Sequence, residues 1–478
     1  MQYNSSMHLL KKTAVLVLLL PACLLAASGS QEAASPDGIA IRNSGISQTL
    51  ARLNTLYQYL RVNALNDIED EVLEENLTRA LVASLDDPYA QFIGPDDVQE
   101  TDESISGTYV GIGVYVSKMD PLFIDWDDST TYMLQVTSPF PGGPAERAGL
   151  KARDLISHID GQSIAQMDAN EASALLRGRE GVPMTLTVHR GDSVFFVSVT
   201  PEEVTAPNVL HSMVDGTPYG YISIADFSES TYSLVSEALT DLSSQGMEAL
   251  VLDLRNNGGG TVNSAQLVAN FFLDDGDTVM FTSFKDGSPR RGYETVASDQ
   301  TRKYRMPIVV IVNAGSASAS EILSAALQEN GKAVVIGQQT FGKGVMQEML
   351  PWQDGYIRYT SSHYQTPEGN DIDGEGITPD IVVQEPGMSD DQVEEYYDFV
   401  YENGDLLSSW IEEHPGYSTG NVEAFADRYS SEVSFDPLYL KVLIRNEYFY
   451  SMDMDERPVM DPVYDIYLRT AIEYLDSL

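Results

Sequence analysis

Three closely spaced serines and a later lysine are the residues of this chain most suited to chemistry. The serines are Ser316, Ser318 and Ser320, and Lys343 follows in the segment Phe341-Gly-Lys-Gly-Val-Met-Gln347. A serine hydroxyl becomes a good nucleophile when a base takes its proton, and a lysine amine can be that base where burial lowers its pKa. Such a pair would permit hydrolysis without a histidine.

The flanking segments predict that the serines lie at a turn between a strand and a helix. Residues 306–312 form an apolar, β-branched run typical of a buried strand, and residues 321–328 consist mainly of helix formers. The N–H groups at a helix start are unpaired and can bind a developing oxyanion. A serine there is also a common helix cap, and a lysine between glycines is commonly a solvated turn residue.

After Lys343 the chain is expected to form a strand from Gly344 to Leu350. Side chains alternate along a strand, so Lys343, Val345 and Gln347 would share one face. Gln347 is thereby placed to orient the lysine amine through a hydrogen bond. We therefore treat Gln347 as a third candidate member of the site.

Several motifs, arranged in one order, resemble those of the C-terminal processing peptidases, the tail-specific serine proteases with a Ser-Lys dyad. Together they extend over roughly residues 45–384. The segments that carry the resemblance are Leu85-Asp-Asp-Pro-Tyr89, Gly111-Ile-Gly-Val114, residues 138–150, Val251-Leu-Asp-Leu-Arg-Asn-Asn-Gly-Gly-Gly260, residues 316–321, Phe341-Gly-Lys-Gly344 and residues 366–380.

The resemblance implies a role for each member of the candidate site. Ser318 would be the nucleophile, Lys343 the general base and Gln347 its support, acting through an acyl-enzyme and without a cofactor or a metal. The implied fold of the catalytic part is a crotonase-like spiral of ββα units. From the residues alone, that spiral cannot be told from other α/β arrangements.

The same resemblance implies an oxyanion hole. One donor would be the N–H of Ala319, and the second an N–H of the glycine-rich loop, for which we take Gly259. The family usually has proline where this chain has Gly258, which adds backbone freedom. The choice between Gly259 and Gly260 therefore stays open.

Residues 104–203 have the short strands and turns of a PDZ domain, which the resemblance also implies. Successive backbone N–H groups can hold a C-terminal carboxylate, and the following strand can accept a peptide by β-augmentation. Residues 170–177 are expected to form the helix that lines this groove, with Arg177 either a surface charge or a link to the active site. The candidate peptide-binding residues are Gly111, Ile112, Gly113 and Val114.

The fold class that we expect is multidomain, with mixed α/β and β regions. Strands and helices alternate after residue 204, which indicates an α/β core, and helical periodicity marks both ends of the chain. The expected segments are a signal peptide (1–30), a leader with an N-terminal helical segment (31–103), a PDZ β-barrel (104–203), a serine protease core (204–384) and a C-terminal helical domain (385–478).

The first residues predict export. Lys11 and Lys12 precede an apolar run over residues 13–27 that ends in small residues, which is typical of a secretory signal peptide. We expect a periplasmic or otherwise extracytoplasmic protein. Cys23 is the only cysteine and lies in a lipobox-like context, so a lipoprotein is the alternative; without that anchor the mature protein has no thiol.

The charge balance limits the partners. The chain has 28 basic and 72 acidic residues, a formal net charge of −44, which argues against nucleic acid and anionic membranes as partners. The acids do not follow a calcium-loop pattern, and His-Glu-x-x-His is absent from the sequence. The expected partners are proteins or peptides with free C-termini, and a second copy or an adaptor bound through the helical ends.

Two other classes of function remain open from the sequence. A secreted PDZ scaffold or ligand-binding protein could retain the same core without catalysis. A crotonase-type lyase acting on coenzyme A thioesters could share the core fold, because fold does not fix function. An intact Ser318, Lys343 and Gln347 set favours the peptidase over both.

Overall fold

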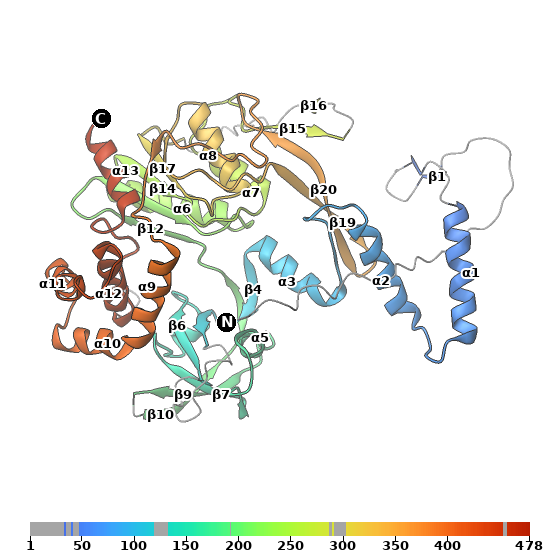
Figure 1. The fold of residues 1–478 in the computed structure, drawn as a ribbon, viewed down its shortest axis with the longest axis horizontal. Coiled ribbons are helices and arrows are strands. Elements are labelled where there is room, and N and C mark those ends of the chain that lie inside the picture. The colour runs from blue at the N-terminus through green and yellow to red at the C-terminus, as the bar shows by residue number, and fades with distance from the viewer. Residues whose placement is uncertain are drawn as a thin grey trace. The chain divides into compact units, whose positions relative to one another are not determined.

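The computed structural model describes residues 33–34, 40–41, 47–118, 132–191, 193–285, 289–290, 303–452 and 457–478 (Figure 1). The expected signal peptide and Cys23 lie outside the described residues. The chain forms two compact units, Met1–Thr101 with Val345–Ser362, and Asp102–Gly344 with His363–Leu478. Within the described residues, no helix has the length and apolar character needed to cross a membrane.

The first unit consists of N-terminal helices and a strand hairpin. Asp87, from the Leu-Asp-Asp-Pro-Tyr segment, accepts hydrogen bonds from the N–H groups of Tyr89 (2.9 Å) and Thr360 (3.1 Å), which joins the end of the helices to the hairpin. The elements are β1 (Ala33–Ala34), β2 (Ala40–Ile41), α1 (Ser47–Asn63), α2 (Asp70–Ala83), β3 (Gln91–Ile93), α3 (Pro95–Ser106, which continues into the second unit), β19 (Val345–Trp352) and β20 (Gly355–Gln365).

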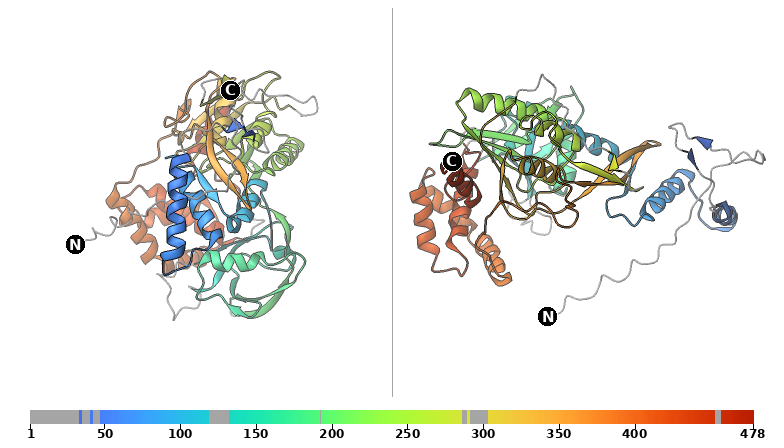
Figure 2. Two further views of the ribbon diagram at one scale, coloured as in Figure 1. Left: turned by 90° about the vertical axis from the view of Figure 1, so that its right-hand side faces the viewer. Right: turned by 90° about the horizontal axis from the view of Figure 1, so that it is seen from above.

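The second unit begins with a small β-domain, seen in Figure 2. Its main sheet has the order β10-β9-β7-β6-β5, and β4 pairs separately with β11. Apolar side chains with no exposed surface fill its interior, among them Leu134, Ile156 and Leu186. The elements are β4 (Thr108–Gly111), β5 (Val114–Ser117), β6 (Leu134–Pro139), α4 (Pro144–Arg147), β7 (Leu155–Ile159), β8 (Gln162–Ser163), α5 (Ala169–Arg177), β9 (Met184–Arg190), β10 (Ser193–Val199) and β11 (Glu202–Thr205).

A mostly parallel sheet forms the centre of the second unit. Its order is β12-β13-β14-β17-β18-β21, with only the β12–β13 pair antiparallel. Every residue of β14 and β17 is buried, as expected for parallel strands covered on both faces. The elements are β12 (Val209–Met213), β13 (Tyr219–Ile224), α6 (Thr231–Ser244), β14 (Ala249–Asp253), α7 (Val262–Ala269), β15 (Phe281–Phe284), β16 (Pro289–Arg290), β17 (Ile308–Val312), α8 (Ala319–Glu329), β18 (Val334–Gly337) and β21 (Ile381–Val382).

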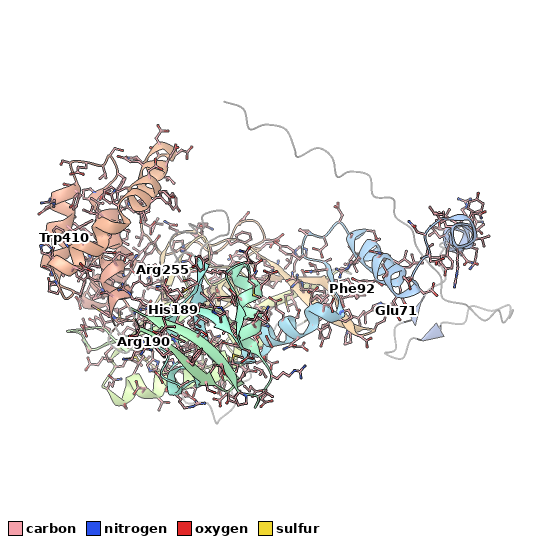
Figure 3. All side chains as sticks on the ribbon, turned by 90° about the horizontal axis from the view of Figure 1, so that it is seen from below. Glu71, Phe92, His189, Arg190, Arg255 and Trp410 are labelled. Carbon is pink, nitrogen blue, oxygen red and sulfur yellow. The ribbon has the colours of Figure 1, made fainter. Side chains whose placement is uncertain are left out.

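The helices that follow β21 contribute to two separate cores. The first four pack around their own aromatic cluster, which includes Phe425, Tyr448 and the Trp410 labelled in Figure 3. The last helix packs instead on the central sheet, where Leu468 and Ala471 meet Val309 and Ile311. The elements are α9 (Asp390–Glu402), α10 (Gly404–Glu413), α11 (Thr419–Tyr429), α12 (Pro437–Ser451) and α13 (Ile466–Asp476).

Helix α13 therefore belongs to the core of the central sheet by its contacts. The alternate residues of the same strands point to the opposite face, on which α6, α7 and α8 lie (Figure 1). The four helices α9–α12 are thus an insertion between the strand β21 and the helix α13, which both pack with the central sheet.

Truncating α13 at its buried face is expected to destabilise the whole sheet. Leu468 is fully buried, so Leu468→Ala should lower the free energy of unfolding by about 2–5 kcal/mol. Leu210→Ala on the edge strand β12 is the control. That side chain is 49 % exposed, so its truncation should lower the free energy of unfolding much less. Equal losses in denaturant titrations of the two variants would contradict the placement of α13.

Candidate active site

The turn between β17 and α8 presents Ser318 in a strained conformation. Ser318 is the residue before the first turn of α8, with φ 55° and ψ −113°. A positive φ is unfavourable for a residue with a side chain, and such strain gathers at functional turns. The surrounding hydrogen bonds must therefore hold this residue in place.

The three candidate serines differ in their surroundings. Ser316 and Ser320 are completely buried, and their hydroxyls donate to the carbonyl oxygens of Leu254 (2.8 Å) and Asn257 (2.9 Å). Ser318 is partly exposed. Two of the serines thus serve to fasten the turn, while the middle one is available to a substrate.

A buried carboxylate connects the serine turn to the lysine segment. Glu321 has no exposed surface, and one of its oxygens accepts hydrogen bonds from the N–H of Ser318 (2.7 Å) and the N–H of Lys343 (2.9 Å). The other oxygen accepts from the Thr340 hydroxyl (2.6 Å) and the N–H of Gly342 (2.7 Å). Four donors satisfy this carboxylate, and two of them belong to the proposed nucleophile and base.

A buried tyrosine makes a second connection between the same two residues. The Tyr364 hydroxyl contacts the carbonyl oxygen of Ser318 at 3.2 Å and also bonds that of Lys343. Burial raises the pKa of Tyr364 well above its usual value, with the charges of Glu321 and Asp373 acting in the same direction. The hydroxyl therefore keeps its proton and remains a donor.

The glycine-rich loop after β14 lies against the serine turn. Gly259 has φ 106°, and a Cβ placed there would lie 2.7 Å from Cβ of Ser318 and 3.0 Å from the nitrogen of Ala319. Only glycine permits this approach. The N–H of Gly259 donates to Oδ1 of Asn257 at 2.9 Å, so an oxyanion would have to share or displace that acceptor. The roles of Ala319 and Gly259 as oxyanion donors stay predictions.

Lys343 and Gln347 lie on either side of the start of β19. Lys343 is half-buried and precedes the strand by two residues, so the strand begins later than the expected Gly344. Gln347 is the third residue of β19 and belongs to the other compact unit. Its support of the lysine amine therefore stays a prediction.

A groove of the β-domain runs between β5 and α5. Near it, the Arg177 guanidinium lies over the Tyr109 ring and forms an ion pair with Glu103 at 2.8 Å. Burial raises the pKa of Tyr109 to about 12, so its hydroxyl is neutral at physiological pH. The groove is lined by Tyr109, Ile112, Gly113, Val114, Val116, Ser173, Leu176 and Arg177.

The sequence predicts a carboxylate-binding loop formed by Gly111, Ile112, Gly113 and Val114. The structure puts three of them, Ile112 to Val114, in the groove lining, whereas Gly111 ends β4 and pairs with β11. The predicted groove helix corresponds to α5. Binding of a carboxylate by this loop stays a prediction.

The site and fold together define a serine peptidase with an attached PDZ domain. Residues 218–383 match peptidase family S41, and residues 135–190 match the PDZ domain. The chain is 33 % identical over 337 residues to the carboxy-terminal processing protease CtpA of Bacillus subtilis, covering 70 % of this chain and 69 % of that protein. It is 32 % identical over 348 residues to a probable CtpA-like serine protease of Staphylococcus aureus, covering 72 % and 67 %.

The chain therefore belongs to the S41 family of C-terminal processing serine peptidases, which confirms the expected class of enzyme and the mixed α/β fold with its PDZ domain. Among solved structures, it is similar to a photosystem II D1 C-terminal processing protease (TM-score 0.38, 28 % identity, 70 % of this chain and 86 % of that one). It is also similar to a putative S41 protease of Bacteroides fragilis (TM-score 0.43, 18 % identity, 69 % and 89 %).

Replacing the Glu321 carboxylate by an amide is expected to disturb the serine turn and the lysine segment at once. In Glu321→Gln an NH₂ group would face two of the four donors, with a loss of about 3 kcal/mol in unfolding free energy and a larger fractional loss of peptidase activity. Glu329→Gln, near the end of the same helix at a partly exposed position, is the control for thermal unfolding and cleavage assays. Matching results for the two variants would contradict the role assigned to Glu321.

Proposed function

We propose that the protein is an endopeptidase in which Ser318 and Lys343 form the catalytic dyad. The Ser318 hydroxyl oxygen attacks a peptide carbonyl carbon while its proton passes to the Lys343 amine. The resulting oxyanion is held by backbone N–H groups, of which Ala319 at the start of α8 supplies one. The peptide C–N bond then breaks, the lysine gives its proton to the leaving amine, and an acyl-enzyme on Ser318 remains.

Water completes the cycle in this proposal. Lys343 takes a proton from the water as it attacks the acyl carbon, and it returns that proton to the Ser318 oxygen when the ester bond breaks, which restores the serine hydroxyl and the free amine. Because Lys343 must be unprotonated to act as a base, we expect the rate to rise with pH. Gln347 is proposed to orient the amine in the assembled site.

One observation carries this proposal: the Glu321 carboxylate binds the main-chain N–H groups of both Ser318 and Lys343. Residues far apart in the sequence are thereby held at the same carboxylate. The accessibility of Ser318, in contrast with its buried neighbours Ser316 and Ser320, supports its choice as nucleophile. The family membership supports the chemistry.

We further propose that the PDZ groove selects substrates by their C-termini. The chemistry of the groove supports this, because the backbone of Ile112–Val114 can meet a carboxylate, while Val116 and Leu176 offer apolar surface to a terminal side chain. The substrates would be proteins or peptides with a free C-terminus. The basic and apolar start of the sequence supports export of the enzyme, and the helical ends are candidate surfaces for a second copy or an adaptor.

Alanine substitutions of the dyad test the mechanism. Ser318→Ala and Lys343→Ala should each abolish cleavage of an unstructured protein in the presence of EDTA, while circular dichroism and thermal unfolding stay close to wild type. Val382→Ala, a change at an exposed position of β21, serves as the active control. Substantial cleavage by purified Ser318→Ala would refute the assignment of Ser318 as the nucleophile. If neither the wild type nor any variant cleaves the protein, a binding scaffold is favoured.

Blocking the substrate C-terminus tests the role of the groove. A peptide with a C-terminal amide should be cleaved with a lower kcat/KM than the same peptide with a free carboxylate, because the amide removes the charge that the loop N–H groups bind. Both peptides keep an identical scissile segment. Equal rates at subsaturating concentrations would exclude recognition of the terminal carboxylate.

A further inference from the structure

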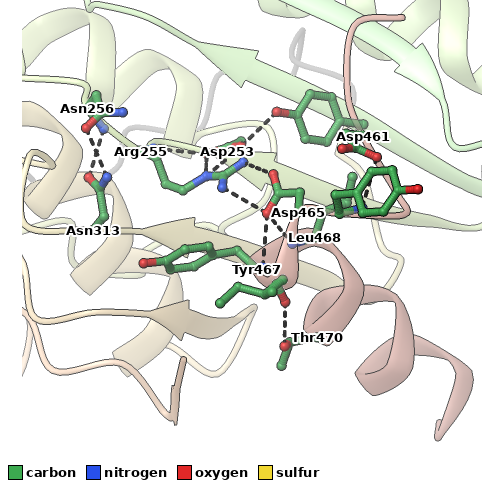
Figure 4. A network of polar contacts seen from close by, with 12 residues as sticks. Asp253, Arg255, Asn256, Asn313, Asp461, Asp465, Tyr467, Leu468 and Thr470 are labelled. Carbon is green, nitrogen blue, oxygen red and sulfur yellow. Dashed lines mark hydrogen bonds and ion pairs between the residues drawn. The ribbon is translucent and has the colours of Figure 1, made fainter. Parts of the chain in front are cut away.

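Arg255 joins the loop after β14 to the last helix of the chain. Its guanidinium makes a two-pronged contact with Asp465, Nη1 to Oδ1 at 3.0 Å and Nη2 to Oδ2 at 2.6 Å. It also contacts Asp253 at the end of β14, with Nε 3.0 Å from both carboxylate oxygens. Figure 4 shows Arg255 lying between the two carboxylates.

The cluster is largely withdrawn from water. The side chains of Asp253, Arg255 and Asp465 are 5 %, 20 % and 16 % exposed, and Arg255 lies over the ring of Tyr467 at 5.0 Å. Burial acts to lower the pKa of Arg255, but the two carboxylates overcome it and hold that pKa above its usual value. The Tyr221 hydroxyl donates to Asp253 at 2.7 Å. At this burial the ion pairs are weakly screened, so they constrain geometry more than surface pairs do.

Arg255 directly precedes the glycine-rich segment that lies against the serine turn. Asn256 follows it with φ 57°, and its main-chain N–H and side-chain oxygen both bond the Asn313 amide, at 2.9 and 3.0 Å. The Asn257 carbonyl oxygen accepts the N–H of Ala317 at 3.0 Å. The glycine loop is thus fixed to the serine turn on one side and, through Arg255, to helix α13 on the other.

We propose that Asp465 is a positioning residue for the peptidase reaction. By holding Arg255, it fixes the start of the glycine loop whose N–H groups are to receive the oxyanion beside Ser318. The proposal rests on the proposed Ser-Lys mechanism and adds to it a dependence of catalysis on the C-terminal helix. Asp465 does not touch the substrate, and its effect passes through Arg255.

Asp465 also has an ordinary structural task, which the test must separate. Its Oδ1 accepts the N–H groups of Tyr467 (3.0 Å) and Leu468 (3.1 Å) and so caps α13. Asparagine and serine are also good N-caps. Asp465→Asn and Asp465→Ser therefore keep a capping side chain and remove the charged partner of Arg255, while Arg255 retains Asp253 as its counter-ion.

The experiment is steady-state peptide cleavage by the full chain, normalised to active sites that a covalent serine reagent titrates. For Asp465→Asn and Asp465→Ser we expect kcat to fall by about 10- to 100-fold, because small displacements of catalytic groups cost that much, with KM nearly unchanged. Asp465→Glu, which keeps the carboxylate, should recover a large part of kcat. The kcat of Arg255→Lys should fall by as much as that of Asp465→Asn. The double variant with both substitutions should have a kcat no lower than either single variant.

Asp461→Asn is the matched control. Asp461 lies four residues earlier, is buried, and pairs with Arg445 at 3.2 Å instead of with Arg255. This variant should lose thermal stability while its kcat per active site stays within about twofold of wild type. Proportionate losses of kcat in Asp461→Asn and Asp465→Asn would reduce Asp465 to a stability residue, and wild-type kcat in Asp465→Ser would overturn the proposal. Both results can occur while Ser318→Ala is inactive, so they are distinct from a failure of the dyad.

Discussion

The carboxylate of Glu321 is the interaction on which the site depends. A buried charge is costly unless donors surround it, and here four donors from two short segments, the serine turn and residues 340–343, do so. The arrangement couples the strained φ of Ser318 to the position of Lys343, because both N–H groups share one oxygen. The Tyr364 hydroxyl connects the same two residues through their carbonyl oxygens. The main chains of the proposed nucleophile and base are therefore held at one carboxylate.

Much of this architecture could be predicted from the sequence, for identifiable reasons. The apolar run at residues 306–312 and the helix formers after Ser320 place a strand and a helix, β17 and α8, around the serines. The sequence does not predict Glu321 and Tyr364 as site residues, because their roles depend on partners from other segments of the chain, later ones for Glu321 and earlier ones for Tyr364. The only local signal for Glu321 is its Ser-x-x-Glu spacing from Ser318, which is typical of a helix start.

The C-terminal region shows where periodicity stops being informative. A helical pattern through Tyr464, Leu468 and Leu475 indicates an amphipathic helix, which the structure confirms from Ile466 onward, with Tyr464 in the turn before it. The pattern cannot say which core the apolar face enters. The structure places Leu468 and Leu475 against the central sheet and Tyr464 in the aromatic core of α9–α12. The buried ion pair of Arg255 and Asp465 also cannot be predicted from the sequence, because the two residues are separated by 210 positions.

The insertion of α9–α12 between β21 and α13 has a consequence for the order of assembly during synthesis. A ribosome releases the chain from its N-terminus, so Ser318, Lys343 and the glycine loop all emerge before α13 does. Until then, one face of the central sheet lacks its helix and Arg255 lacks Asp465. The nascent polypeptide thus carries both residues of the proposed dyad before it can form the complete core around the central sheet, which requires α13.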